Sequence, residues 1–492
     1  MSARPFSQTQ APTLSRLLTM DGDARLRCDP RSGRNRYGCL PHPLDTRPSF
    51  ASSTASSISK AAFARVEDLR GRVAGADPEL QAAEFERLRA ELTALCGLEG
   101  PGAPAIVFAP AGTDLHLIVA QLSGAESRLE ERGVLRVLMT ETSETGNGVP
   151  AALAGRHYNA RAPLSGEVED GGQMGGCRPV ELCMLSSRGA DSRPRGAELD
   201  AEVERLCVEA ASAGKNVLLI VSDVSKTGLL APSPSLALDL LRRFPGRVDV
   251  LVDACQFRLS PATLRAYLGQ GFLIALTGSK FVTGPAFSAA LLVPPALASL
   301  WQRRSLPASL SAYSARSDWP KGWEGRGSMV RECNLGLLLR WEAALTEMKA
   351  FRLLPDKAVE GFLRAFAVAV TKRLASGGAL EALPLGPLDR GPFAQEPGWD
   401  AVPSLFPFLL KRDGYLDHAE TRAVYETLLE RHGHIGQPAR CGARQGREVS
   451  ALRICASMRL AVDALAPGGR GTEAVVKEAL VLLDQTERLV RG

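Results

Sequence analysis

A lysine at the end of an apolar run is the first residue of this sequence that suggests chemistry. Lys280 follows the apolar run 272–276 and Thr277, and Gly284-Pro285 comes shortly after it. The chain has only ten lysines against 49 arginines, so a lysine at this place is informative. A lysine removed from water has a lowered pKa and attacks aldehydes readily. The pattern favours a Schiff-base lysine, and the alternative is a surface lysine whose ammonium reaches water.

Other apolar runs end in polar residues that suit the same ligand. Asp253 ends one run and Gln256 follows it. A carboxylate there is costly to bury unless it is paired, and a protonated pyridine nitrogen is a suitable partner. Gly112 and Thr113 follow another run and open a helix, whose free N–H groups favour a phosphate. The alternatives are that Asp253 and Thr113 only cap helices.

Two hydroxyl residues add to this set. Thr277 precedes the lysine and can reach a phosphate, and Ser225 lies in the polar segment 222–228 after a further apolar run. Ligands of α/β sheets gather at the carboxyl ends of the strands, where all of these residues are expected. Segment 222–228 means little when it is taken alone.

The elements that must position these residues are short apolar runs that alternate with helical segments. Near-continuous apolar runs are typical of strands covered on both faces, and their alternation with helices predicts a mostly parallel sheet. The seven predicted strands are 105–109, 134–139, 180–185, 217–221, 248–252, 272–276 and 289–293.

The domain organisation follows from changes in composition and apolar pattern along the chain. Residues 1–100 are expected to be an N-terminal arm with helices, in which residues 1 to about 60 are loops and not core. Residues 101–300 are expected to form the large α/β domain. Residues 301–492 are expected to form a smaller α+β C-terminal domain with connecting helices.

Composition excludes several classes of protein. Apolar residues make up 45% and charged residues 23%, which is ordinary for a globular protein, and no apolar run is long enough to cross a bilayer. The net charge of +5 is spread among acids, so nucleic-acid binding has little support. None of the ten cysteines forms a zinc-binding pattern, so no metal is expected. The N-terminus lacks a secretory signal, and we expect a reducing, cytoplasmic location.

Taken together, the motifs resemble a known enzyme family. The segment from about 105 to 294 resembles the class V branch of fold-type I pyridoxal-phosphate (PLP) enzymes, which includes cysteine desulfurases, aminotransferases and kynureninase-like lyases. The spacing of 27 residues between the aspartate and the lysine is similar to that of the family. The matching motifs are Gly112-Thr113, Asp253-Ala254-Cys255-Gln256 and Thr277-Gly278-Ser279-Lys280 with Gly284-Pro285.

The resemblance implies a fold, a cofactor and roles for residues. The fold would be aspartate-aminotransferase-like, with PLP held on Lys280, which would also move the substrate proton. Asp253 would pair with the ring nitrogen, and Arg453 would bind a substrate carboxylate. The residues implied for the rest of the cofactor are Gly112, Thr113 and Thr277 at the phosphate, Gln256 and Ser225 near the phenolic oxygen, and Ser328 at the phosphate of the neighbouring subunit in a homodimer.

The sequence also departs from the family pattern. Family members usually stack an aromatic residue or histidine on the cofactor ring, but segment 141–148 has neither, and Thr145 or Asn147 is expected there instead. His116 and His157 are expected to be structural. Desulfurases carry a nucleophilic cysteine on a loop of the C-terminal half. Cys333 and Cys441 lie in that half, but neither has a convincing loop context.

Three functions remain open. An aminotransferase acting on an amino acid or amine is the first choice, and a lyase, an epimerase or a desulfurase-like enzyme needs nearly the same residues. A non-catalytic PLP-fold binding protein is a second hypothesis, favoured by the missing ring-stacking residue. A nucleotide-binding enzyme is a third, but the glycine-rich segment 171–176 follows no clear strand. Segments 33–38 and 52–59 resemble arms that close over family active sites, without an assigned role.

Overall fold

Alternating burial of apolar residues builds the large sheet. The structure is a computed structural model that describes residues 12–43, 47–124, 133–394 and 398–492. In β2 (Ala105–Ala109), Ile106 and Phe108 pack into one core, whereas Val107 packs into another on the opposite face. Successive side chains of a strand point to opposite faces, so a run that is apolar at every position needs cover on both sides.

The large sheet has the strand order β2-β11-β10-β9-β7-β3-β6. The pairs β2–β11 and β11–β10 are antiparallel, and the remaining four pairs are parallel. The prediction of a mostly parallel seven-stranded sheet is confirmed, and the two-residue strand β8 (Leu230–Ala231) adds an eighth strand beside β7. The other strands are β3 (Leu135–Thr140), β6 (Val180–Leu185), β7 (Asn216–Asp223), β9 (Val248–Ala254), β10 (Leu273–Thr277) and β11 (Ala289–Val293).

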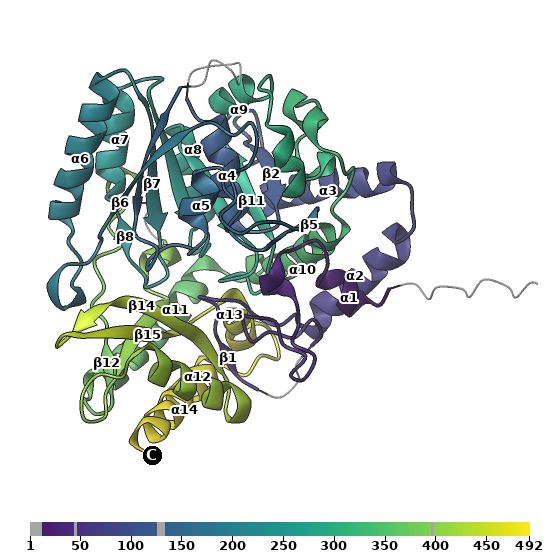
Figure 1. The fold of residues 1–492 in the computed structure, drawn as a ribbon. Helices are drawn as coiled ribbons and strands as arrows, with labels where there is room; N and C mark the ends of the chain where they lie inside the picture. The colour runs from purple at the N-terminus through teal and green to yellow at the C-terminus, as the bar shows by residue number, and fades with distance from the viewer. Residues whose placement is uncertain (1–11, 44–46, 125–132, 395–397) are drawn as a thin grey trace, which may run out of the picture.

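Helices cover both faces of this sheet (Figure 1). Apolar residues of α4 (Gly112–Leu122) and α5 (Val149–Leu153) pack on one face. The other face is covered by α6 (Ala197–Ser212), α7 (Pro234–Arg243), α8 (Pro261–Gly269) and α10 (Leu335–Arg352). The three layers place the carboxyl ends of β7, β9 and β10 at one edge of the sheet.

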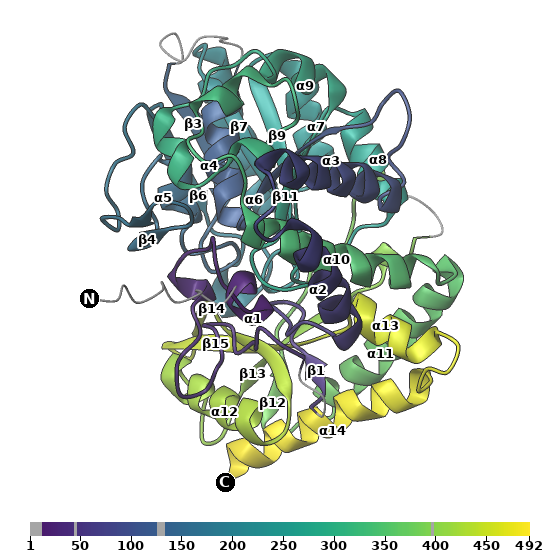
Figure 2. The same cartoon turned by 90° about the vertical axis from the view of Figure 1, so that its right-hand side faces the viewer.

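A second sheet lies beside that edge. It has five strands in the order β1 (Ser49–Phe50), β14 (His434–Arg444), β15 (Arg447–Cys455), β13 (Leu405–Leu410) and β12 (Leu380–Ala382). Its β14 and β15 run below the large sheet, and their outer side is packed by helices (Figures 1 and 2). The helices of this part are α11 (Asp356–Ala375), α12 (His418–Arg431), α13 (Met458–Leu465) and α14 (Thr472–Arg491).

The N-terminal region contributes to both parts of the molecule. Leu14, Leu17 and Leu18 of α1 (Leu14–Leu18) are buried in the main core, and β1 pairs with β14. The expectation that residues 1 to about 60 hold no core is therefore wrong, because leucines at three-to-four spacing bury one face of a short helix. Residues 1–11 lie outside the described residues. The helices α2 (Lys60–Val73) and α3 (Pro78–Leu95) pack against α10.

The remaining elements are short. They are α9 (Pro295–Trp301), the ribbon of β4 (Arg161–Ala162) and β5 (Gly166–Glu167), and several 3-10 turns, including η1 (Ala24–Leu26) and η6 (Glu324–Ser328). In the part of the chain that the structure describes, no helix combines the length and apolarity that a membrane span requires. The division into three domains stays a prediction.

A buried ion pair joins the loop before β13 to the large sheet. Arg390 donates two hydrogen bonds, of 2.7 and 2.8 Å, to the carboxylate of Asp223 at the end of β7. Both side chains are almost fully buried, and Tyr267 donates a third bond to Asp223. The pair therefore fixes the end of β7, from which the polar segment 224–228 continues.

Removing one partner of this pair should destabilise the fold strongly. We expect Arg390→Met to lower the free energy of unfolding by about 3–5 kcal/mol, because it leaves the charge of Asp223 buried and unpaired. Urea unfolding followed by circular dichroism measures the change. The double variant Arg390→Met, Asp223→Asn should recover part of the loss, and a single variant as stable as wild type would show that the pair is not what fixes this loop.

Candidate active site

A cavity of about 690 Å³ lies between the carboxyl ends of the large-sheet strands and β14 and β15. Three separate parts of the chain form its wall: the N-terminal segment, the large sheet with its loops, and the small sheet. The predicted residues that line it are Gly112, Thr113, Thr145, Ser225, Asp253, Gln256, Thr277, Lys280 and Arg453. Ser328 lies in η6 and does not line the cavity of its own chain.

The floor of the cavity is the turn between β2 and α4. Gly112 begins α4, so its N–H and that of Thr113 belong to the first turn, where N–H groups have no partner within the helix. A Cβ on Gly112 would lie 2.6 Å from Sγ of Cys255, so the close approach of this turn to β9 requires glycine. Thr277 lies beside the turn and donates a 2.5 Å hydrogen bond to the carbonyl oxygen of Cys255.

Asp253 at the end of β9 has a histidine partner. Nε2 of His116 lies 3.4 Å from Oδ2 of Asp253, and Nδ1 of His116 contacts the carbonyl oxygen of Gly112 at 2.8 Å. Burial alone would raise the pKa of Asp253, but the hydrogen bond and charge of His116, together with Lys280, hold it below its usual range. Asp253 is therefore kept ionised in a place where a neutral acid would otherwise be favoured.

His116, which was expected to be structural, lines the cavity. Its position four residues after Gly112 puts it one turn along α4, and its Nδ1 contacts the carbonyl oxygen of Gly112. Burial lowers the pKa of His116, but the hydrogen bond and charge of Asp253 outweigh burial and raise it. The four-residue spacing was the signal that sequence reasoning passed over.

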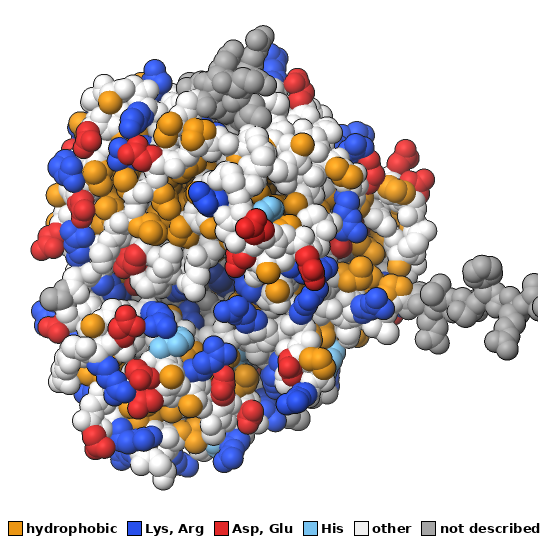
Figure 3. Space-filling view, viewed as in Figure 1, with side chains coloured by type: hydrophobic (Ala, Val, Ile, Leu, Met, Phe, Trp, Pro, Cys, Tyr) orange, Lys and Arg blue, Asp and Glu red, His pale blue; other side chains and the backbone are white. Residues whose placement is uncertain are grey.

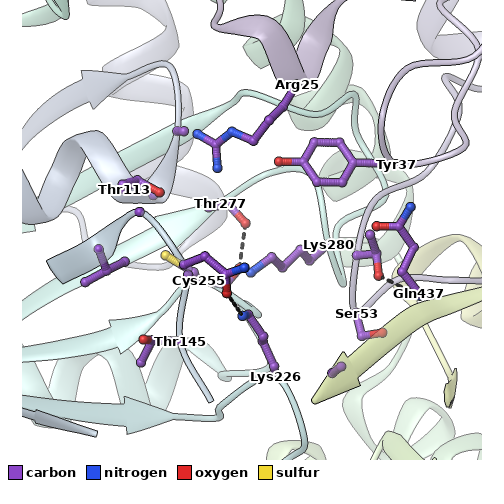
Figure 4. A pocket seen from close by; sticks show the side chains of 18 of the residues that line it. Arg25, Tyr37, Ser53, Thr113, Thr145, Lys226, Cys255, Thr277, Lys280 and Gln437 are labelled. Carbon is purple, nitrogen blue, oxygen red and sulfur yellow. Dashed lines mark hydrogen bonds between the residues drawn. The ribbon is translucent and has the colours of Figure 1, made fainter. Parts of the chain in front are cut away.

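Lys280 and Lys226 face one another across the cavity (Figure 4). Lys280 follows β10, and Lys226 lies on the loop that follows β7. Gln256 donates a 3.1 Å hydrogen bond to the backbone oxygen of Ser53, and its Oε1 has no partner within the described residues. The cavity therefore contains two amines and a buried amide oxygen that is free to accept.

Glu144 fixes the loop that carries Ser225. Arg188 donates a 2.7 Å hydrogen bond to Glu144, and Ser225 and Thr227 donate to the same carboxylate at 2.6 Å. Thr145, the next residue, is buried at the wall of the cavity, and Asn147 lines it too, so which of them takes the place of the missing aromatic residue stays a prediction. Because Glu144 is already paired with Arg188, its charge offsets that of Lys226 only in part.

Arg453 on β15 is buried without an acidic partner in the described residues. It donates 3.3 and 3.2 Å hydrogen bonds to the backbone oxygen of Lys226 and to Oγ1 of Thr54, and a further bond to the backbone oxygen of Gln437. Its Nε has no partner there. Burial lowers the pKa of Arg453, as expected for a cation that lacks a counter-ion.

The N-terminal segment forms the roof of the cavity, with Arg25 and Tyr37 above Thr113 and Thr277 (Figure 4). Arg25 is held by its bonds to Asp23 and by stacking on Phe287. Segments 33–38 and 52–59 do reach the site, as the arm-like pattern suggested, through Arg36, Tyr37, Ser53 and Thr54. Sequence reasoning missed Arg25 because no local pattern links it to residues more than 80 positions away.

Burial keeps the thiols of Cys255 and Cys441 protonated. Cys255 is the cysteine that lines the cavity in the described part of the chain, and burial raises its pKa well above the usual value. Cys441 is buried in β14, where burial raises its pKa to about 12. Described residues contain no cluster of three or more potential metal ligands.

Comparisons with known proteins support the fold. The cysteine desulfurase CsdA from Escherichia coli aligns over 89% of this chain and 94% of its own, with a TM-score of 0.53 and 14% identity. The cystine C–S lyase C-DES, in complex with cysteine persulfide, aligns over 90% and 98%, with a TM-score of 0.55 and 16% identity. A NifS-like protein from Rickettsia africae aligns over 89% and 100%, with a TM-score of 0.52 and 10% identity.

The chain has the fold of these enzymes. No family model matches its sequence, and no curated protein matches it either. At 10–16% identity the likeness is one of fold, which confirms the predicted architecture of the large and small units. The chemistry has to be argued from the residues of the cavity.

The coupling between Asp253 and His116 can be measured directly. In wild type, His116 should titrate above its ordinary pKa of 6.5, because the carboxylate stabilises the imidazolium. In Asp253→Asn, burial and the charge of Lys280 lower the pKa of His116 and only the contact with Gly112 still raises it, so the pKa should fall below 6.5. Nuclear magnetic resonance of ¹⁵N-labelled histidine measures both values, and His116→Gln assigns the resonance. An unchanged pKa in Asp253→Asn would contradict the pairing.

Proposed function

We propose that this protein is a PLP-dependent enzyme that acts on an amino acid. The carrying observation is that Lys280, the ionised Asp253 and the turn at Gly112 line one cavity together with Arg453. PLP has an aldehyde, a basic ring nitrogen and a phosphate, and the three groups require an amine, a carboxylate and N–H donors. The donor set of this cavity fits that demand. A structure of C-DES in which glycine is covalently linked to the PLP cofactor belongs to a protein of the same fold.

Each residue has a distinct role in this proposal. When bound, PLP supplies an aldehyde that condenses with amines and a ring that accepts electrons. Lys280 provides the amine that holds it and then carries the proton at the substrate Cα. Asp253, kept ionised by His116, accepts a hydrogen bond from the ring nitrogen. The N–H groups of Gly112 and Thr113 hold the phosphate at the positive end of α4.

The remaining residues orient the substrate and the ring. Arg453 binds the substrate carboxylate, a task that suits a buried guanidinium without a counter-ion. Gln256 and Ser225 would contact the ring oxygen, and Thr145 would take the position of a stacking residue. Ser328 would contribute only in a homodimer, to the cavity of the neighbouring subunit, and both the dimer and this contact are part of the proposal.

For the reaction type, we favour cleavage of the bond between Cβ and its substituent. The sequence alone had favoured transamination. The solved structures of this fold include desulfurases and a C–S lyase. A desulfurase that transfers sulfur to its own cysteine needs a reactive thiol, and the thiol of Cys255 is held protonated by burial. A lyase that releases its product directly needs none. With purified enzyme, elimination would release product without a keto acid, whereas transamination would require one.

The first test is whether Lys280 carries the cofactor. Purified wild type with PLP should show a yellow absorption band, and borohydride reduction followed by peptide mass spectrometry should place the label on Lys280. Lys280→Ala should lose this label, because no amine remains at that position. Lys357→Ala, on the exposed surface of α11, is the matched control. A colourless wild type, or a label on Lys226 in its place, would contradict the assignment. A labelled protein that turns over no amino acid would favour a binding protein.

The turn at Gly112 gives a second test. Gly112→Ala should weaken PLP binding by about tenfold, because overpacking against Cys255 displaces the N–H groups at the phosphate. The double variant with Cys255→Ala should recover affinity, since the next atom that a Cβ would meet lies 3.5 Å away. Gly102→Ala, which meets nothing within 4 Å, is the control. A fluorescence titration with PLP measures the affinities, and a tight single variant would exclude this role of the turn.

A further inference from the structure

Lys226 is a second lysine in the cavity, and the proposed function leaves it unused. Its loop is rigid, because its backbone N–H donates a 2.8 Å hydrogen bond to the backbone oxygen of Glu144, whose side chain holds both neighbours of Lys226. The side chain points into the cavity opposite Lys280 (Figure 4). A side chain on so well-fixed a loop is placed to bind a ligand and not merely to extend into water.

The ammonium of Lys226 has only neutral partners. Nζ donates a 2.9 Å hydrogen bond to the backbone oxygen of Thr142 and a 3.3 Å bond to Oδ1 of Asn147. A lysine has three donors, so one donor remains for a ligand. No carboxylate forms an ion pair with Lys226 among the residues that the structure describes, although only ten lysines occur in the chain and two of them face this cavity.

The charges around Lys226 leave the cavity with an excess of cations. Arg453 from β15 and Lys280 from the end of β10 face it as cations, while Glu144 and Asp253 are the acids that act on it. These acids are already paired, Glu144 with Arg188 and Asp253 with His116. Basic side chains also gather on the surface along the junction of the two sheets (Figure 3).

Two cations inside the cavity lack an acidic partner once PLP is held on Lys280, whereas Arg36 lines the cavity with an exposed side chain. Lys280 is consumed by holding PLP, and the phosphate lies at the turn of α4. Arg453 and Lys226 are then the uncompensated cations, and they are adjacent, because Nη1 of Arg453 donates a 3.3 Å bond to the backbone oxygen of Lys226. An amino acid with an uncharged side chain supplies one carboxylate, which would neutralise only one of them.

We propose that Arg453 and Lys226 bind two acidic groups of one substrate, so that the substrate is an amino acid whose side chain carries a carboxylate or an anion of similar shape. This inference deepens the proposed function and rests on it. Arg453 takes the α-carboxylate, and Lys226 takes the acidic group of the side chain through its free donor. The two charges hold the substrate from both ends, which fixes its Cα beside Lys280.

This arrangement makes substrate binding take up a proton. Burial, followed by the charges of Arg453 and Lys280, lowers the pKa of Lys226 to about 7 in the free protein. A bound anion raises that pKa again, because it stabilises the ammonium. Below this lowered pKa the lysine is already protonated, whereas above it binding takes up a proton and the affinity falls by about tenfold per pH unit.

The test uses succinate, a dicarboxylate that has no amine to react with the cofactor. Isothermal titration calorimetry of the PLP-loaded protein, in buffers of different ionisation enthalpy, measures the affinity and the proton uptake together. We expect Lys226→Met to weaken binding by about tenfold or more and to abolish proton uptake. Lys226→Arg should still bind succinate, but without uptake and without the fall in affinity above pH 7, because arginine stays charged.

Matched controls separate this role from a structural one. Lys357→Met removes an exposed lysine of α11 and should behave as wild type. Acetate in place of succinate carries a single carboxylate, so its binding should depend on Arg453 and not on Lys226. Turnover should show the same pattern: Lys226→Met should lower kcat/KM for an amino acid with an acidic β-substituent, such as cysteine sulfinate, by about tenfold or more, but leave kcat/KM for one with a neutral leaving group, such as β-chloroalanine, nearly unchanged.

The outcomes also separate this inference from the proposed function. A PLP-loaded protein that binds succinate equally well with and without Lys226, or that does not bind it at all, overturns the two-cation site and leaves the PLP assignment standing. A protein that takes up no PLP overturns the proposed function, and with it the substrate assignment. Retained succinate binding with unchanged proton uptake in Lys226→Met would show that another group titrates.

Discussion

A buried carboxylate at the end of a parallel strand is the constraint around which this site is arranged. Asp253 can remain ionised inside the protein only if positive groups surround it, because an isolated charge is costly to bury. His116 supplies the first of these groups from the start of α4, and Lys280 supplies the second from the end of β10. The strand order places β9 beside β10, and α4 packs across the same edge, so the topology itself brings the partners together.

Arginines perform the equivalent task for the backbone. Arg340 donates from α10 to the carbonyl oxygens of Phe287, Leu18, Met20 and Asp21, and thereby ties the N-terminal region to the large sheet. Arg258 likewise reaches Ser404 and Ala456 in the small unit. A planar guanidinium with five donors can satisfy several carbonyl groups at once, which a lysine cannot. Arg258 and Arg340 thus serve the structure, and in a chain with far more arginine than lysine the two lysines of the cavity stand out.

The sequence was sufficient for the large sheet and for the residues at its strand ends. Those residues follow their strands directly, so the apolar run and the polar residue after it are one local pattern, as for Asp253 and Lys280. The roof was not predictable in the same way. Arg25 and Tyr37 reach the cavity by contacts between distant parts of the chain, and a segment rich in Ser, Arg and Pro carries no periodic pattern that reveals such contacts. The role proposed for Ser328 would require a second subunit, because η6 does not line the cavity of its own chain.

Because three parts of the chain form the cavity, the cavity exists only when the whole chain is folded. Lys280 and Asp253 belong to the large sheet, Arg453 belongs to the small one, and Arg25 belongs to the N-terminal segment. A ligand that contacts all three binds only the folded arrangement and stabilises it by mass action. The bulge in β14 between Gly436 and Ala439 serves the same arrangement, because it turns Gln437 toward the cavity, where its amide donates to the backbone oxygen of Arg36. Together with the pairing of β1 with β14 and the bond from Arg453 to Thr54, this contact holds the N-terminal segment above the site.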